Sequence, residues 1–149
     1  EREEWFKKIK SNNSFLTSYS SVSNKTIDKI GITKATARAI KNCLIKLSSN
    51  FSHPVSNFKI MLDGSLYAPS NYRNQQTIIK GDEKIPLIAA ASIIAKVTRD
   101  RKMIRLAKKY PEYAFDIHKG YGTKLHREAM KSHGICEIHR KSFCSKFVN

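Results

Sequence analysis

Two aspartates in this sequence stand at the ends of short apolar runs, each beside a glycine. Asp63 follows the run 58–62, and Asp82 completes a Lys-Gly-Asp turn after the run 76–79. Ligands gather at the carboxyl ends of strands in an α/β sheet, where neighbouring strands lie about 4.8 Å apart. Two carboxylates there can share a Mg²⁺ or Mn²⁺ ion, because these cations prefer oxygen ligands. The alternative is that both aspartates are turn residues, since Asp-Gly and Gly-Asp favour turns.

Two further groups of residues are suited to contact a phosphate backbone. Ser92 and Lys96 are four residues apart in a predicted helix over 84–109, so they share one face of it. Lys119 and Tyr121 belong to the string His-Lys-Gly-Tyr-Gly. There the lysine can bind phosphate while the tyrosine stacks on a sugar or base. The alternatives are a solvated basic helix face and a glycine-rich connector with a half-buried tyrosine.

The C-terminal part offers a different metal chemistry through four possible zinc ligands, His133, Cys136, His139 and Cys144. Their gaps of two, two and four residues match no common zinc finger, so we do not predict a zinc site. We expect His53 and His126 to be surface or capping residues. The three cysteines include no Cys-x-x-Cys pair, which argues against a disulfide framework and favours a reducing cytoplasm.

The charge of the chain indicates a polyanionic partner. There are 28 Lys and Arg residues against 12 Asp and Glu, a formal net charge of +16. Nucleic acid is the leading candidate, an anionic membrane surface is the second, and the remaining alternative is that the charge serves only solubility. The longest apolar run, 85–95, is interrupted by Pro86 and Ser92 and is shorter than the roughly 18 residues of a membrane span. The chain opens with charged residues and shows no signal-peptide pattern.

Hydrophobic spacing and helix-boundary signals predict the elements that position these residues. We expect helices over 1–10, 26–30, 33–47, 84–109 and 123–132, and strands over 15–22, 58–62 and 76–79. Thr33 is the predicted N-cap of the third helix. The predicted buried side of the long helix comprises Ile88, Ala91, Ser92, Ala95, Met103 and Leu106. Loops are expected over 48–57, 66–74 and 113–122, and 135–149 is left unassigned. This mixture indicates an α/β fold in a single domain over 1–149.

Several of these strings together resemble the bacterial ribonuclease HII family, a type 2 ribonuclease H. The matching strings are 62–64, 79–86, 88–101, 110–113, 118–124 and 139–143. The resemblance covers nearly the whole chain and is most specific over 78–143. It implies an RNase H-like fold, with a mixed sheet flanked by helices and further helices at the C-terminus.

The resemblance also implies an activity and its site residues. Members carry three Asp and one Glu that hold Mn²⁺ or Mg²⁺, and Asp63 and Asp82 resemble the third and fourth of these. Tyr121 resembles the tyrosine that packs against the nucleotide at an RNA–DNA junction. The implied reaction is two-metal hydrolysis of the RNA strand in RNA–DNA hybrids, or of ribonucleotides embedded in DNA. It leaves 5′-phosphate and 3′-hydroxyl ends. We expect a cytoplasmic monomer whose partner is such a duplex.

One departure from the family is large. Members carry their first Asp and Glu side by side in a glycine-rich strand near the N-terminus, whereas the only Asp-Glu pair here is Asp82-Glu83. A smaller departure is Ser65, where the family often has Asn. We therefore expect an N-terminally incomplete domain with half of the acidic tetrad and impaired activity alone. Two other readings stay open: a non-catalytic nucleic-acid-binding remnant and a basic structural RNA-binding protein.

Overall fold

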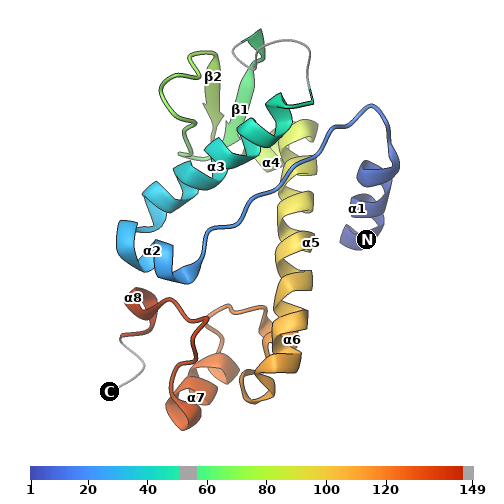
Figure 1. Cartoon of the computed structure of the whole chain (residues 1–149). Helices are drawn as coiled ribbons and strands as arrows, with labels where there is room; N and C mark the ends of the chain where they lie inside the picture. Colours follow the sequence, from blue (N-terminus) through green and yellow to red (C-terminus); the bar gives the residue numbers. More distant parts are fainter. Residues whose placement is uncertain (51–56, 146–149) are drawn as a thin grey trace.

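Helix α5 (Pro86–Lys109) runs through the molecule, and the other elements lie along it (Figure 1). The computed structural model describes residues 1–50 and 57–145. The remaining elements are α1 (Arg2–Ser11), α2 (Asn24–Ile30), α3 (Ile32–Ser48), β1 (Ile60–Asp63), β2 (Gln75–Ile78), α4 (Gly81–Lys84), η2 (Pro111–Tyr113), α6 (Phe115–His118), α7 (Lys124–His133) and α8 (Lys141–Cys144). The predicted α/β class is confirmed at this level. His53 and most of the predicted loop 48–57 lie outside the described residues.

Two prolines, Pro86 within the first turn and Pro111 just beyond the last residue, set the boundaries of α5. Pro86 occupies the first turn, where a missing N–H costs no hydrogen bond. Ile85 is extended, with φ −122° and ψ 112°, because a residue before proline avoids the helical region. The predicted helix over 84–109 is therefore two helices, since Lys84 belongs to α4. At the other end, Tyr110 stops the helix before Pro111.

The buried face of α5 differs from the predicted one. Ile88, Ile94 and Val97 are buried, whereas Ala91, Ser92 and Ala95 are exposed. This stretch is apolar on nearly every side, so spacing alone does not select a face. Helices α1, α4 and α6 and strand β1 pack against α5 and determine which of its side chains are covered.

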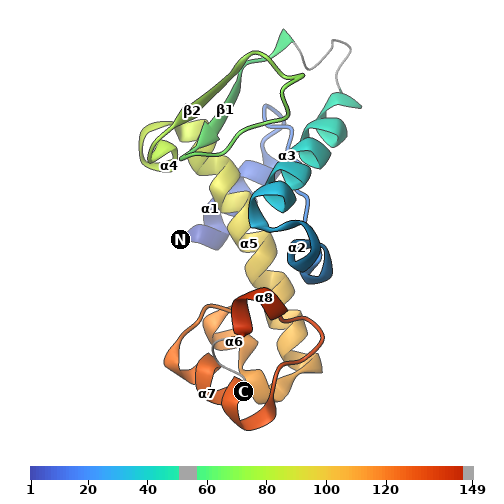
Figure 2. The ribbon, with the colours of Figure 1, turned by 90° about the vertical axis from the view of Figure 1, so that its left-hand side faces the viewer.

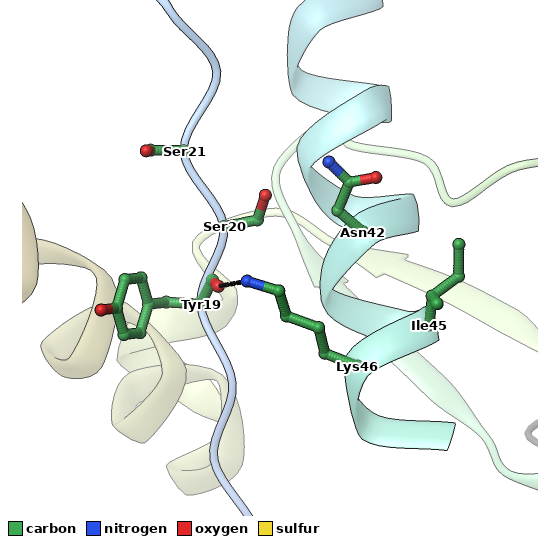
Figure 3. Close-up of a pocket in the computed structure, with 6 residues that line it drawn as sticks. All are labelled: Tyr19, Ser20, Ser21, Asn42, Ile45 and Lys46. Carbon is green, nitrogen blue, oxygen red and sulfur yellow. Dashed lines mark hydrogen bonds between the residues drawn. The ribbon is translucent and has the colours of Figure 1, made fainter. Parts of the chain in front are cut away.

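The predicted strand over 15–22 is wrong. This segment is extended but belongs to no sheet, and it passes beside α3 (Figure 3). Lys46 Nζ donates to the carbonyl of Tyr19 at 3.2 Å, and Lys10 Nζ donates to Thr17 Oγ1 at 2.9 Å. A strand needs a neighbouring backbone to pair with, whereas here the Tyr19 carbonyl is bonded by the Lys46 side chain and the Lys10 bond reaches only the Thr17 hydroxyl.

Gly31 separates α2 from α3 in the N-terminal part. Ser23 caps α2 by accepting from the backbone N–H of Thr26 at 3.1 Å. Gly31 adopts φ 80°, which allows a sharp turn, and α3 begins at the next residue. The prediction of Thr33 as the N-cap of α3 is therefore wrong.

The sheet of the described residues has two strands, β1 and β2, which are parallel. Asp63 pairs with Ile78, so the carboxyl ends of the strands coincide. The mixed sheet implied by the resemblance is thus not observed in residues 1–50 and 57–145. The predicted strands 58–62 and 76–79 are both present, shifted by one or two residues.

The C-terminal helices surround the end of α5 opposite the sheet (Figure 2). Tyr113, Phe115, Met130 and Cys144 form a buried cluster there. The predicted loop over 113–122 contains α6 and the end of η2, so that assignment is wrong in part. The predicted helix over 123–132 is confirmed as α7, capped by the side chain of its N-cap residue, a threonine.

Polar contacts join α2 to α8. The side-chain amide of Asn24 donates to the carbonyls of Glu137 and His139, at 2.8 and 2.9 Å. The carboxylate of Asp28 accepts the first two backbone N–H groups of α8, at 2.9 and 3.1 Å. These bonds fix the C-terminal segment against the N-terminal half.

All three cysteine thiols are free. Among the described residues, no helix has the length and apolar character of a membrane span.

Candidate functional site

The ends of β1 and β2 bring the two predicted metal ligands to one edge of the sheet. Asp63 is the last residue of β1, and its Oδ1 accepts the backbone N–H of Gly81 at 2.7 Å. Gly81 immediately precedes Asp82, which is exposed in the first turn of α4. The predicted meeting of two strand ends is thus confirmed, and Asp63 is hydrogen-bonded to the residue before Asp82.

The lack of a side chain at Gly81 leaves room for this close approach. A Cβ at this position would lie 2.8 Å from Ile88 Cδ1 and 3.3 Å from Asp63 Oδ1. Lys80, just before it, adopts a left-handed conformation with φ 54°, which turns the chain from β2 into α4. The Gly-Asp string that indicated a turn therefore also brings the backbone against the Asp63 carboxylate.

The cations near this turn are engaged locally. Lys80 Nζ lies 3.6 Å from a carboxylate oxygen of Glu83, and Lys84 Nζ donates to the carbonyl of Ile79 at 2.9 Å. In the part of the chain that the structure describes, no three His, Cys, Asp or Glu side chains converge as a metal site. The four C-terminal His and Cys residues considered for zinc likewise form no such group. Asp63 and Asp82 offer oxygen ligands suited to a hard cation, but only as a pair.

The predicted phosphate-contacting residues on α5 lie between this edge and the C-terminal core. Ser92 is exposed and Lys96 is half-buried. Arg99 is three residues further, on the same face of the helix. At about 1.5 Å per residue, the helix axis advances about 20 Å from Pro86 to Arg99.

Tyr121 and Lys119 belong to a loop beside the middle of α5. Arg99 Cζ lies 4.4 Å from the ring centroid of Tyr121, which is 53% exposed. Lys119 is left-handed, with φ 52°, and its ammonium donates to the carbonyl of Asp116. The structure thus gives two groups of predicted residues, an acidic pair near the start of α5 and an aromatic–basic loop further along it.

Three buried histidines behind this loop were not predicted. His118, His126 and His139 are 6%, 5% and 6% exposed, so the prediction of His126 as a surface or capping residue is wrong. His126 Nδ1 donates to the carbonyl of Tyr121 at 3.0 Å, and its Nε2 accepts from His139 Nε2 at 3.0 Å. The rings of His118 and His126 are stacked at 4.3 Å. They lie 8 and 13 residues apart in three different segments, α6, α7 and the stretch before α8, so the packing of these segments brings them together.

Burial influences the protonation of two of these histidines, His126 and His139. Desolvation lowers the pKa of both His126 and His139, so the neutral imidazoles are favoured. His139 Nδ1 accepts the backbone N–H of Cys136 at 3.0 Å, which is consistent with a proton on Nε2. Burial also raises the pKa of the Cys136 thiol. The neutral forms of His126 and His139 therefore support the loop at Tyr121.

Comparison with known proteins decides the family. A family model described as Ribonuclease HII matches residues 1–146. The chain belongs to the ribonuclease HII family. A protein of Endomicrobium trichonymphae named Ribonuclease HII is 47% identical over 122 residues, covering 82% of this chain and 55% of the relative. A second, from Sulfurovum sp. (strain NBC37-1), is 45% identical over 83% of this chain and 60% of its own length.

More distant relatives of the ribonuclease HII family cover more of the chain. Proteins of Coxiella burnetii with the same name are 41% identical over 143 residues, which is 95% of this chain and 66% of the relative. The chain thus spans between half and two thirds of the length of these relatives. The family resemblance noted from the sequence motifs is confirmed.

Proposed function

We propose that this chain contributes to an endonuclease that hydrolyses the RNA strand of RNA–DNA hybrids, including ribonucleotides embedded in DNA. The observation that carries the proposal is the edge of the sheet where Asp63 is bonded to Gly81, next to Asp82. Membership of the ribonuclease HII family supports the same reaction. The expected products carry 5′-phosphate and 3′-hydroxyl ends.

Asp63 and Asp82 are the residues that would hold Mn²⁺ or Mg²⁺. Their oxygen atoms suit such hard cations, and the hydrogen bond from Gly81 to Oδ1 orients the Asp63 carboxylate. When bound, the metal ions would activate a water molecule and stabilise the leaving 3′ oxygen. The two aspartates position the ions and do not act as nucleophiles.

Substrate binding is assigned to the basic face of α5 and the loop beside it. Ser92 and Lys96 are proposed to contact phosphates, with Lys119 adding a cation and Tyr121 an aromatic surface for a sugar or base. The formal net charge of +16 supports a nucleic-acid partner. Binding should weaken steeply as salt rises, because phosphate contacts release counterions.

The 149-residue chain supplies two of the four carboxylates that the family uses. Two carboxylates can hold one metal ion weakly. If two ions were bound, most of the ligands of each ion would have to come from elsewhere. We therefore expect little or no cleavage by this chain alone. We also propose that it forms one domain and acts as a monomer. A reducing cytoplasm is the proposed setting, supported by the three free thiols.

A chimera tests the assignment of the aspartates. Joining the family's N-terminal Asp-Glu strand to this chain should give Mn²⁺-dependent cleavage of a labelled RNA–DNA hybrid, well above that of the chain alone. Asp63→Asn in the chimera should abolish cleavage, while Asp116→Asn, an exposed acidic residue on α6, should not. A chimera that is equally active with Asp63→Asn would refute the proposal. Tight hybrid binding with no cleavage would favour the binding-only reading.

A further inference from the structure

The guanidinium group of Arg99 connects helix α5 to the loop that carries Tyr121. Its Nη2 donates to the carbonyl of Lys119 at 2.8 Å, and its Cζ lies 4.4 Å from the Tyr121 ring centroid. Its Nη1 lies 3.6 Å from Asp100 Oδ1. Arg99 therefore contacts both the backbone and the aromatic ring of the loop, and its contact with Asp100 is an ion pair without a hydrogen bond.

Helix α7 fixes the backbone of the same loop from the other side. His126 Nδ1 donates to the carbonyl of Tyr121 at 3.0 Å, and Arg127 Nη1 donates to the carbonyl of Gly122 at 2.8 Å. A Cβ on Gly120 would lie 3.1 Å from the side chain of Met103, so the loop also passes close to α5. These contacts restrain the main chain of the loop. The orientation of the Tyr121 ring depends instead on the side chains that contact the ring.

We infer that Arg99 is a positioning residue that orients the Tyr121 ring for contact with a nucleotide of an RNA–DNA hybrid. The inference rests on the proposed role of Tyr121 in substrate binding. A planar guanidinium can stack on one face of the ring while it donates to the Lys119 carbonyl, and the half-exposed ring keeps surface for a sugar or base. A lysine ammonium keeps the charge but cannot form the same flat stack.

Arg101 provides a matched control on the same helix. Its Cζ lies 4.4 Å from the ring centroid of Phe6, the same separation as between Arg99 and Tyr121. It pairs with Glu3 of α1 rather than with the loop. Arg101→Lys therefore removes an equivalent arginine–aromatic stack without touching Tyr121.

A double-mutant cycle on the 149-residue chain measures the dissociation constant for a short RNA–DNA hybrid. Tyr121→Ala should weaken binding by roughly 5- to 150-fold, the range for losing an aromatic stacking contact. Arg99→Lys should weaken binding several-fold in the parent and have no effect in the Tyr121→Ala background. Arg101→Lys should leave binding unchanged. Equal losses from Arg99→Lys in both backgrounds would overturn the inference, because Arg99 would then contact the nucleic acid directly.

A second measurement needs no nucleic acid. Incorporating 3-fluorotyrosine labels the six tyrosines for ¹⁹F NMR, and the Tyr121 signal is the one missing in Tyr121→Phe. Arg99→Lys should shift that signal and Arg101→Lys should not. A Tyr121 signal that does not shift in Arg99→Lys overturns the inferred role of Arg99, but it leaves the proposed role of Tyr121 standing. If Tyr121→Ala leaves the dissociation constant for the hybrid unchanged, the proposed role of Tyr121 is overturned, and the inference about Arg99 falls with it.

Discussion

Replacing Gly81 with alanine tests the packing that brings Asp63 beside the turn into α4. The added methyl carbon would lie 2.8 Å from Ile88 Cδ1, whereas carbon atoms in good contact are about 3.5–4.0 Å apart. Either the new methyl carbon or Ile88 Cδ1 must therefore move by about 1 Å. Ile88 is only 6% exposed, so its side chain must move within a packed region. Overpacking of this kind costs about 1–3 kcal/mol. In a chain of this size, that lowers the melting temperature by roughly 2 to 12 °C.

Removing the clashing methyl group should rescue the Gly81→Ala variant. Ile88→Val deletes Cδ1 and by itself costs about 0.5–1.5 kcal/mol. In the Gly81→Ala background the same change relieves the contact, so the double variant should be more stable than the sum of the single losses predicts. Urea denaturation followed by circular dichroism measures each free energy of unfolding.

Gly122→Ala is the control for this series. A Cβ at Gly122 meets no atom within 4 Å, so this variant should unfold like the parent. If Gly81→Ala also unfolds like the parent, or if the two single losses simply add in the double variant, the reasoning about the turn is refuted. Weaker Mn²⁺ binding by Gly81→Ala would link the packing to the site, because the new methyl also lies 3.3 Å from Asp63 Oδ1.

Two further predictions concern ionisable groups. Burial lowers the pKa of His126 and His139, whereas unfolded histidine titrates near about 6.5. The contribution of these two neutral histidines to stability is therefore complete above that pH, and it is lost as the pH falls through their lowered folded-state pKa values. Urea unfolding should show a lower free energy of unfolding at about pH 5.5 than at about pH 7.5. A flat pH profile over this range would argue against buried neutral imidazoles. Hydrogen bonding to Ser142 lowers the pKa of Asp28, so Asp28→Asn should lower the melting temperature and Asp116→Asn should not. Equal melting temperatures for these two variants would count against the link between α2 and α8.

Local signals in the sequence predict a large part of the fold. Pro86 and the Tyr110-Pro111 string mark the ends of α5, and Thr123 and Gly134 mark those of α7. The meeting of the Asp63 and Asp82 segments was also predictable, because parallel strands end at the same edge of a sheet.

Features that depend on distant neighbours could not be read from the sequence. The segment 15–22 has strand-forming residues, but pairing depends on which backbone lies beside it, and the Tyr19 carbonyl is bonded by the Lys46 side chain instead. The buried face of α5 depends on the elements that pack against it, since the helix is apolar on several sides. His118, His126 and His139 carry no shared local motif, so only the fold reveals their cluster.

Paramagnetic broadening by Mn²⁺ tests the proposed metal site most directly. Substoichiometric Mn²⁺ added to the ¹⁵N-labelled chain should first broaden the amide signals of Gly64, Gly81 and Asp82, the residues adjoining the two carboxylates. Asp63→Asn should remove this effect, while Asp116→Asn should leave it intact. Broadening that begins elsewhere in the chain, or that persists unchanged in Asp63→Asn, would contradict a metal site built from Asp63 and Asp82.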